Sequence, residues 1–386
     1  MTSAEIVVIG AGVIGTSIAF RLAESGRQVM MIDRNGIGAA TSSACDKAIF
    51  LQSKRPGLHM DLARESRNMY NTLEEELGQS VEFKGAGGTV AIHTEQQMLF
   101  MKKFVHDQTQ AGINVSLLNQ KEAKEQQPIL ADDIIGASYS PDDAEVNPLK
   151  LSQGFATAAK RLGVEIMTHT EAIGIEKSNG KVTGVKTSKG VISTETVINA
   201  CGPFASSIAR FSGVPMNIKP RRGVILISEK VDPIVNGSLL DAQYIAAKHL
   251  SGQQPEYGIG LSLGQTDSGN LLIGGSREFV GFNKHVHSDV LHAIAYHACK
   301  VVPALTNIRI IRSMVGFRPF TGDGLPIIDR SEQLRGYILA AGHEGDGIAL
   351  SPITGCLVRD LLNGGGPTSR FLPHLTSDRF KEKTLL

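Results

Sequence analysis

The first segments of the chain alternate between apolar runs and a helical stretch. The run at 5–10, apolar and mostly β-branched after its first residue, ends at a glycine and predicts a strand buried on both faces. A helical pattern follows as far as Glu24 and ends at Ser25 and Gly26. Residues 27–33 predict a second strand that ends in an aspartate. The start of the chain is therefore predicted to be a βαβ unit.

Further along the chain, short apolar strands recur between helical patterns. A helix is predicted from Lys150 to Leu162, with Asn147 as its N-cap and Pro148 at its first position. The other predicted elements are strands at 164–168, 182–186, 194–199 and 336–341, a helix from about 348 to 362, and a hairpin of 257–263 and 270–275 around the turn cluster 266–269. Strands that alternate with helices predict an α/β fold.

The overall composition excludes several classes of protein. The 386 residues include 39 Lys and Arg against 38 Asp and Glu, a net charge of +1, so the electrostatic footprint of a nucleic-acid-binding protein is missing. With 5% aromatic residues and no tryptophan, few side chains could stack on bases. A hydrophobic content of 41% is enough for a large core. At roughly 150 residues per domain, the length predicts two or three domains.

The cysteine and histidine positions indicate no metal centre. The four cysteines lie far apart without a CxxC pair, which is typical of free thiols in a reducing compartment. Four histidines between residues 285 and 297 are spaced so that at most one pair shares a helix face. The chain starts without a signal-peptide pattern, and its early apolar segment is shorter than the roughly 20 residues that span a membrane. We therefore expect a cytoplasmic protein with no metal, no membrane span and no nucleic-acid partner.

A glycine-rich turn joins the first strand to the first helix. Gly10, Gly12 and Gly15 form a GxGxxG pattern, and Asp33 follows Gly10 by 23 residues at the end of the second strand. The first glycine permits the tight turn, the second lets the backbone approach a pyrophosphate, and the third lets the helix close on the strand. The helix N-terminus directs free N–H groups at the phosphates, and the aspartate can accept hydrogen bonds from ribose hydroxyls. This pattern predicts dinucleotide binding.

Later segments indicate which dinucleotide binds. A small, hydroxyl-rich loop occupies 36–44, and glycines follow two further buried strands, at 199–203 and 342–347. Three separate segments of the chain therefore have the character of a nucleotide-binding loop. This suits an extended FAD better than NAD(H), which one contiguous Rossmann domain ordinarily holds. FAD is therefore expected, and an NAD-dependent dehydrogenase stays as the alternative.

Together these segments resemble a known family over nearly the whole chain. The sequence is similar to the D-amino-acid oxidase-type family of FAD-dependent oxidoreductases, and within it to glycine oxidase-like enzymes and the catalytic subunits of D-hydroxyproline, opine and hydrogen-cyanide-forming glycine dehydrogenases. The segments that carry the resemblance are 10–33, 41–44, 199–204, 315–319 with 323–326, and 342–348.

The resemblance implies an architecture of two domains. A Rossmann-like FAD-binding domain would be built from three discontinuous segments, and an α+β substrate domain with a mainly antiparallel sheet would cover the flavin. The expected segments are 1–84, 149–219 and 316–386 for the FAD-binding domain, and 85–148 and 220–315 for the substrate-binding domain.

The resemblance also assigns residues to the cofactor. Ala172 would contact the adenine, Ala200 and Gly202 the pyrophosphate and ribityl, residues 44–47 the isoalloxazine, and a helix N-terminus at 345–348 the flavin N1 and C2 carbonyl. The expected cofactor-binding residues are Gly10, Ala11, Gly12, Val13, Ile14, Gly15, Asp33, Arg34, Thr41, Ser42, Ser43, Ala44, Cys45, Asp46, Lys47, Ala172, Ala200, Gly202, Gly342, His343, Glu344, Gly345, Asp346, Gly347 and Ile348.

For the chemistry, the resemblance implies hydride transfer from the amine-bearing carbon of the substrate to the flavin N5, which gives an imine. Arg318 stands where relatives bind the substrate carboxylate, which a guanidinium matches in a bidentate pair. A structural ion pair between Arg318 and Asp323 is the alternative role. Some family members attach flavin through a Cys near 315–321, where this chain has none, so we expect non-covalent FAD, with Cys45 as the one nearby thiol.

The substrate and the partners are less sharply indicated. Residues 45–47 depart from the small apolar residues of glycine oxidases, which favours a D-hydroxyproline, D-proline or opine dehydrogenase catalytic subunit. A glycine or sarcosine oxidase that uses oxygen is one alternative, and a non-catalytic flavin-binding subunit is another. The 45–47 loop and the 343–346 turn resemble those of multi-subunit dehydrogenases, which implies a redox partner subunit in a hetero-oligomer.

Overall fold

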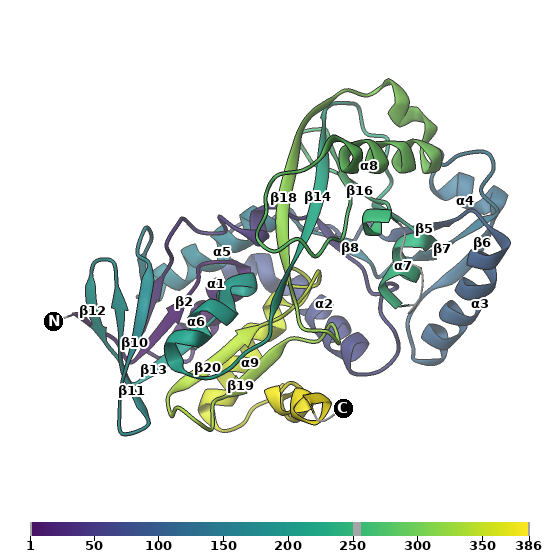
Figure 1. Ribbon diagram of the computed structural model, residues 1–386. Helices are drawn as coiled ribbons and strands as arrows, with labels where there is room; N and C mark the ends of the chain where they lie inside the picture. The colour runs from purple at the N-terminus through teal and green to yellow at the C-terminus, as the bar shows by residue number, and fades with distance from the viewer. Residues whose placement is uncertain (1, 250–255, 385–386) are drawn as a thin grey trace.

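The computed structural model describes residues 2–249 and 256–384, and in it two large sheets lie in different halves of the molecule (Figure 1). Most of the helices lie on the outside of these sheets. The α-helices are α1 (Val13–Glu24), α2 (Leu58–Leu77), α3 (Glu95–Gln110), α4 (Gln120–Gln126), α5 (Pro148–Arg161), α6 (Ala205–Ser212), α7 (Ala242–His249), α8 (Ser288–Val301) and α9 (Ser351–Asn363).

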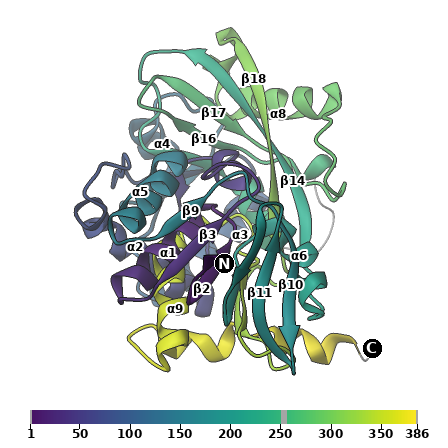
Figure 2. The same ribbon diagram turned by 90° about the vertical axis from the view of Figure 1, so that its left-hand side faces the viewer.

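The first large sheet has six strands, and four of its five neighbouring pairs are parallel. The pair at its edge, β19 with β20, is antiparallel. Figure 2 shows β2, β3 and β9 side by side beneath the helices that cover them. In spatial order the strands are β19 (Ile327–Arg330), β20 (Tyr337–Ala341), β13 (Thr196–Asn199), β2 (Ile6–Ile9), β3 (Val29–Ile32) and β9 (Glu165–Met167).

Local sequence signals fix the helices beside this sheet. Gly12, in extended backbone conformation, is the N-cap of α1, and the helix ends at Glu24 as predicted. Asn147 caps α5 by accepting hydrogen bonds from the N–H groups of Leu149 and Lys150, both at 3.1 Å. The predicted βαβ unit and the predicted cap are both confirmed.

The second large sheet has eight strands and is antiparallel except where β15 meets β5. Its longest strands, β14 and β18, pair along most of their length and run between the two halves of the molecule (Figure 1). In spatial order the strands are β18 (Ile310–Phe320), β14 (Lys219–Lys230), β17 (Asn270–Gly274), β16 (Ser262–Gln265), β15 (Ser238–Asp241), β5 (Gly88–Ile92), β7 (Gly136–Ser140) and β6 (Ser116–Asn119).

Two smaller sheets and several 3₁₀ turns complete the described residues. The four-stranded sheet has the order β1 (Thr2–Ser3), β12 (Gly190–Ser193), β11 (Lys181–Thr187) and β10 (Ala172–Ser178), and the two-stranded sheet pairs β4 (Ala48–Ile49) with β8 (Ala144–Glu145). The 3₁₀ turns are η1 (Thr41–Ser43), η2 (Gly202–Phe204), η3 (Glu256–Gly258), η4 (Pro303–Asn307), η5 (Ser369–His374) and η6 (Ser377–Thr384).

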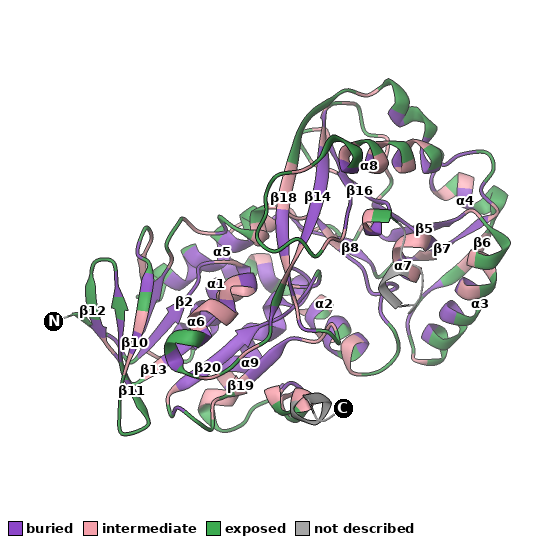
Figure 3. Cartoon of the chain, viewed as in Figure 1, coloured by how far each residue is buried: buried purple, intermediate pink, exposed green. Residues whose placement is uncertain are grey.

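The predicted fold class is confirmed: a Rossmann-like sheet built from discontinuous segments stands beside a mainly antiparallel α+β unit. Figure 3 shows the strands of the six-stranded sheet as mostly buried and the outer faces of helices such as α3 and α8 as exposed. Along the described chain, no helix combines the length and the apolar character that a membrane span needs. The residue boundaries of the two domains stay a prediction.

Two local predictions are wrong. The last long helix begins at Ser351, three residues after the predicted start at Ile348, because residues 347–350 form turns and Pro352 suits the first helical turn. The first strand of the predicted hairpin is β16 alone, since Tyr257 lies in a 3₁₀ turn with φ +55°. The second strand and the turn between them are as predicted.

Candidate active site

The carboxyl ends of the parallel strands gather the predicted cofactor segments at one edge of the six-stranded sheet. Gly10 follows β2, Asp33 follows β3 and Ala200 follows β13. The segment 168–172 follows β9, and Gly342 follows β20. Ligands of open α/β sheets bind at this edge, because the loops there leave a crevice. The sheet order therefore brings together segments up to 332 residues apart in the sequence.

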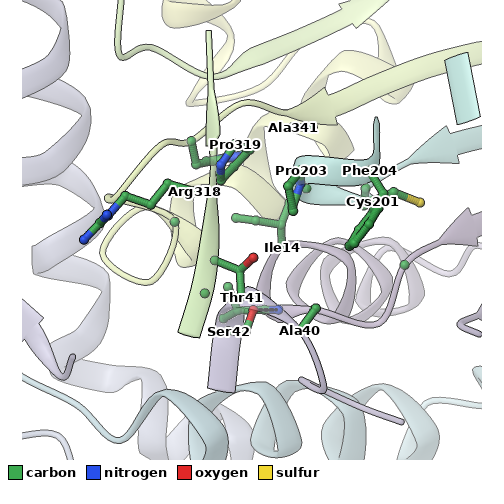
Figure 4. Close-up of a pocket in the computed structure, with 18 of the residues that line it drawn as sticks. Ile14, Ala40, Thr41, Ser42, Cys201, Pro203, Phe204, Arg318, Pro319 and Ala341 are labelled. Atoms are coloured by element: carbon green, nitrogen blue, oxygen red, sulfur yellow. Dashed lines mark hydrogen bonds between the residues drawn. The ribbon is translucent and has the colours of Figure 1, made fainter. Parts of the chain in front are cut away.

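A cavity lies along this edge. In the view of Figure 4 the Arg318 side chain reaches toward one end, Cys201 and Phe204 lie at the other, and Ile14 and Thr41 lie between. The predicted residues that line the cavity are Gly10, Gly12, Val13, Ile14, Asp33, Arg34, Thr41, Ser42, Ala44, Cys45, Asp46, Ala172, Ala200, Gly202, Arg318, His343, Glu344, Gly345, Gly347 and Ile348.

The three glycines of the first turn have different physical constraints. Gly10 has φ +110°, and a Cβ there would lie 2.7 Å from the Ala200 carbonyl oxygen. A Cβ at Gly15 would lie 1.8 Å from the Gly10 carbonyl oxygen, so the helix can close on the turn only with glycine there. At Gly12 the backbone is ordinary, and a Cβ would meet only the Ser42 Oγ, at 3.2 Å. The chain itself leaves room at Gly12, which fits a pyrophosphate that approaches the backbone there.

Polar groups next to this turn are held in place. The Ser42 hydroxyl accepts a hydrogen bond from the Val13 N–H at 3.0 Å, at the N-terminus of α1. Asp33 accepts hydrogen bonds from the N–H groups of Ala11, at 2.8 Å, and Asn35, at 2.7 Å. Since each carboxylate oxygen has two lone pairs, Asp33 keeps the capacity to accept a ribose hydroxyl as predicted. The next N–H groups of α1 have no carbonyl one turn earlier in the helix, so they suit an anion.

Six predicted cofactor residues do not line the cavity: Ala11, Gly15, Ser43, Lys47, Gly342 and Asp346. The ammonium of Lys47, the residue before β4, forms a buried ion pair with Glu145 of β8 at 2.9 Å. Asp346 contacts Lys54 at 2.6 Å and His59 at 3.1 Å. These carboxylate and ammonium groups stabilise the loops around the cavity instead of facing into it, because each has a buried opposite charge elsewhere.

The other four serve the geometry of the turns. Ala11 is buried and donates its N–H to Asp33, and Gly15 packs against Gly10. The Ser43 hydroxyl donates to the Ala40 carbonyl at 3.1 Å. Gly342 has φ +88°, and a Cβ there would lie 2.3 Å from Thr321. Each shapes a segment whose neighbours line the cavity.

Arg318, on β18, lies at the end of the cavity formed with the eight-stranded sheet. One Nη donates a hydrogen bond to the Ser276 carbonyl at 2.9 Å, and Gly223 on β14 leaves space for the guanidinium, since a Cβ there would lie 2.4 Å from it. Burial, the largest effect, lowers the pKa of Arg318 below its ordinary value. Asp323 instead pairs with Arg379 at 2.7 Å. The alternative in which Arg318 is the ion-pair partner of Asp323 is therefore wrong.

The turn after β20 borders the same end of the cavity. His343 is buried, contacts the Thr354 hydroxyl at 3.0 Å, and has its pKa lowered to about 3 by burial. The imidazole is therefore neutral at physiological pH. Glu344 has φ +51° and forms an ion pair with Arg221. Because α9 begins only at Ser351, turn backbone and not a helix N-terminus borders the cavity here, contrary to the prediction.

Cys45 and Cys201 also line the cavity. Burial raises the pKa of both thiols, so neither is a thiolate at physiological pH. The nucleophile of cysteine is the thiolate, so this environment disfavours covalent attachment of a cofactor. Non-covalent binding stays the expectation.

Several lining residues lie outside the predicted set. Phe204 has the Arg34 guanidinium 4.1 Å above its ring centre, at the end of the cavity away from Arg318. The motif at 199–204 is the sequence signal for Phe204, but the expected contacts from this motif are Ala200 and Gly202 alone. Tyr244 comes from α7, beside the eight-stranded sheet, and no sequence pattern connects it to the glycine-rich turns. Further lining residues without a prediction are Asn35, Ala40, Thr170, Glu171, Pro203, Ser207, Ile208, Phe211, Ile225, Gly316, Pro319, Ala340 and Ala341.

Curated relatives and solved structures resemble the chain over most of its length. Hydrogen cyanide synthase subunit HcnC of Pseudomonas protegens is 26% identical, over 93% of this chain and 92% of the relative, and glycine oxidase of Bacillus subtilis is 28% identical over the same shares. The structure of L-proline dehydrogenase from P. horikoshii has a TM-score of 0.89 and 27% identity, over 99% of both chains. Glycine oxidase from Bacillus cereus has a TM-score of 0.86 and 26% identity, over 97% of this chain and 99% of the other.

The family comparison covers almost the whole chain. The family model described as FAD dependent oxidoreductase, DAO, matches residues 5–361. This range includes all five segments that carried the resemblance and every predicted site residue. The chain therefore belongs to the DAO family of FAD-dependent oxidoreductases.

Proposed function

We propose that the chain oxidises an amino acid or a secondary amino acid at the carbon that bears the nitrogen, with FAD as electron acceptor. The observation that carries the proposal is Arg318: its guanidinium borders the cavity, and no acidic side chain of the described residues forms an ion pair with it. A partly buried guanidinium without an acidic partner suits a substrate carboxylate.

The residues that line the cavity would have different roles along its length: some would bind the cofactor and others the substrate. The glycine-rich turn at 10–15 and Ser42 would hold the pyrophosphate, and Asp33 the ribose. Arg318 would orient the substrate by its carboxylate, so that the C–H bond at the amine-bearing carbon faces the flavin. Bound FAD supplies a hydride acceptor. The C–H bond breaks with its electron pair, a C=N bond forms, and the nitrogen releases a proton, so a substrate that binds with a neutral amine needs no strong base.

The domain assignment and the finer substrate assignment belong to the same proposal. Residues 1–84, 149–219 and 316–386 would form the FAD-binding domain, and 85–148 with 220–315 the substrate-binding domain.

A D-proline, D-hydroxyproline or opine dehydrogenase remains our preferred class, and the similarity to an L-proline dehydrogenase supports a secondary amine. The similarity to glycine oxidases supports glycine or sarcosine oxidation with oxygen as the second candidate.

A partner subunit is part of the proposal. The relative HcnC is named as a subunit of hydrogen cyanide synthase. If re-oxidation passes through a partner, the isolated chain should turn over quickly with an artificial dye and slowly with oxygen. Hydrogen peroxide production as fast as dye reduction would contradict this and favour the oxidase.

Matched substrate pairs test the proposed function. Dye-linked turnover is measured with proline against pyrrolidine, and with sarcosine against dimethylamine, since each pair differs only in the carboxylate. We expect turnover with at least one amino acid and none with its decarboxylated partner. Turnover that is equal within each pair would contradict a carboxylate site. A flavin that no amine or amino acid reduces would favour the non-catalytic subunit. The NAD-dependent alternative is wrong, because the family is FAD-dependent.

A further inference from the structure

Three arginines lie close together at the Arg318 end of the cavity. Arg318 lines the cavity, and Arg221 and Arg277 contact the lining residues Glu344 and Tyr244. Arg221 on β14 and Arg318 on β18 are directly paired residues of the two strands. Arg277 follows β17, and its guanidinium lies 3.9 Å above the ring centre of Tyr244, a residue that lines the cavity. Arg318 donates a hydrogen bond to the carbonyl of Ser276, the residue before Arg277. The paired strands β14 and β18 and the segment after β17 therefore bring the three guanidinium groups near one another.

Within the described part of the chain, one of the three has an acidic partner. Arg221 forms an ion pair with Glu344, whereas among the described residues no ion pair joins Arg277 or Arg318 to a carboxylate. One Nη of Arg277 is buried and has no hydrogen-bond partner. The segment 250–255, which precedes η3 and lies outside the described residues, contains no acidic residue in its sequence. The neighbouring Arg222 differs, because Glu278 pairs with it at 2.6 Å.

The acidic groups that face the cluster have partners of their own. Glu344 pairs with Arg221, and Asp346, which raises the pKa of Arg221, pairs with Lys54 and His59. Asp46 lines the cavity and raises the pKa of Arg318, but it also accepts a hydrogen bond from the Ser262 hydroxyl at 2.7 Å. Burial, followed by the charges of Arg318 and Arg277, lowers the pKa of Arg221 to about 9. Burial also lowers the pKa of Arg318, with Arg277 contributing to the effect. The positive charges repel one another. A bound anion would therefore reduce this repulsion and would pair with the guanidinium that has no acidic partner.

One substrate carboxylate accounts for Arg318 and leaves Arg277 without a counter-charge. We propose that Arg277 binds a second carboxylate, and that the substrates are amino acids or secondary amino acids with two carboxylates. This inference rests on the proposed function, since it assumes that Arg318 binds the first carboxylate. Arg277 is a specificity-determining residue here and takes no part in hydride transfer. The cation–π contact with Tyr244 restricts its guanidinium, and the planar fork of a guanidinium suits bidentate binding of a carboxylate.

The test compares substrates that differ by one carboxylate. Anaerobic flavin reduction is followed in the holoenzyme with iminodiacetate and with N-methylglycine, which share the secondary amine and one carboxymethyl group. Aspartate and glutamate, each as both enantiomers, distinguish a second carboxylate on the side chain from one on the nitrogen substituent. We expect the wild type to bind its best diacid about 10- to 100-fold more tightly than the matching monoacid, the range for one charged hydrogen-bonded pair.

Variants assign this preference to Arg277. Arg277→Met should abolish the preference for the diacid, with a much larger loss of affinity for the diacid than for the monoacid, and Arg277→Lys should recover part of the preference. Arg312→Met, at an exposed position on β18, is the matched control and should change neither. FAD content and Tm are measured for each variant, because loss of the Tyr244 contact could unfold the region. The Lys variant keeps the charge and so separates recognition from folding.

The outcomes that would contradict the role of Arg277 differ from the outcome that would contradict the proposed function. Equal losses for diacid and monoacid in both Arg277 variants would overturn the inference and make Arg277 structural. Wild-type binding that is as tight for the monoacid would also overturn it, while the proposed oxidation of amino acids would stand. If no amino acid with one or two carboxylates reduces the flavin, the proposed function itself fails.

Discussion

At the residue scale, the partners of charged groups decide what each one can do. The motif around Arg318 points to this residue from the sequence. That Asp323 does not pair with Arg318 could not be predicted, because Arg379, the residue that pairs with Asp323, lies 56 residues after Asp323 in the chain. The same holds for Asp346, which reaches Lys54 across 292 residues. Such pairs depend on how distant segments pack, and no local pattern records them.

Replacing Arg318 tests its role directly. Arg318→Leu removes one partner of a buried charged pair, which costs about 3–5 kcal/mol, so kcat/KM for a carboxylate substrate should fall by roughly 10²–10³ or more. Arg318→Lys should recover only part, because it loses the fork geometry. FAD content and Tm should stay near wild type. A variant whose flavin is reduced at the wild-type rate would remove Arg318 from the site.

His343 should make stability depend on pH. Burial lowers its pKa to about 3 from 6.5, so between these values the unfolded chain binds a proton that the folded chain does not. The free energy of unfolding therefore falls as pH falls through this window, by up to about 1.4 kcal/mol per pH unit. Urea unfolding at several pH values should show a shallower acid dependence for His343→Gln than for wild type. Parallel curves would mean that His343 titrates normally in the fold.

At the element scale, the glycine-rich turn shows what local sequence can specify. The strand, the turn, the helix and the roles of Gly10 and Gly15 follow from short-range sterics, and the structure has them where the pattern predicts. The start of α9 was not predictable in the same way. The predicted helix starts at about Ile348, but Asp346, in the turn that precedes Ser351, forms a buried ion pair with Lys54.

Alanine at three glycines separates folding from cofactor binding. Gly12→Ala should fold, because the chain leaves room for a Cβ, but should bind FAD roughly 10- to 100-fold more weakly if a pyrophosphate fills that space. Gly15→Ala should fail to fold well, since its Cβ would lie 1.8 Å from a carbonyl oxygen. Gly36→Ala, where nothing lies within 4 Å, is the control. Flavin content after gel filtration and Tm give both readouts. Full FAD content in Gly12→Ala would contradict the proposal that a pyrophosphate fills the space next to Gly12.

At the scale of the whole molecule, the site forms where two sheets meet. The sequence predicts the half of the site at the edge of the six-stranded sheet, because loops after parallel strands share an edge. The other half comes from β14 and α7, which contribute Ile225 and Tyr244, and their position depends on strand pairing across the chain. The Arg318 end is therefore the less predictable part, and under the proposed function it is the part that determines specificity.

The most direct test of the central claim is anaerobic reduction of the enzyme-bound FAD by an amino acid deuterated at the amine-bearing carbon. The proposed function predicts loss of the visible flavin absorbance on mixing, a slower rate with the deuterated substrate, and recovery of the imine or its hydrolysis product. Reduction by hydroxy acids in preference to amino acids, or no reduction by any amino acid, would contradict it.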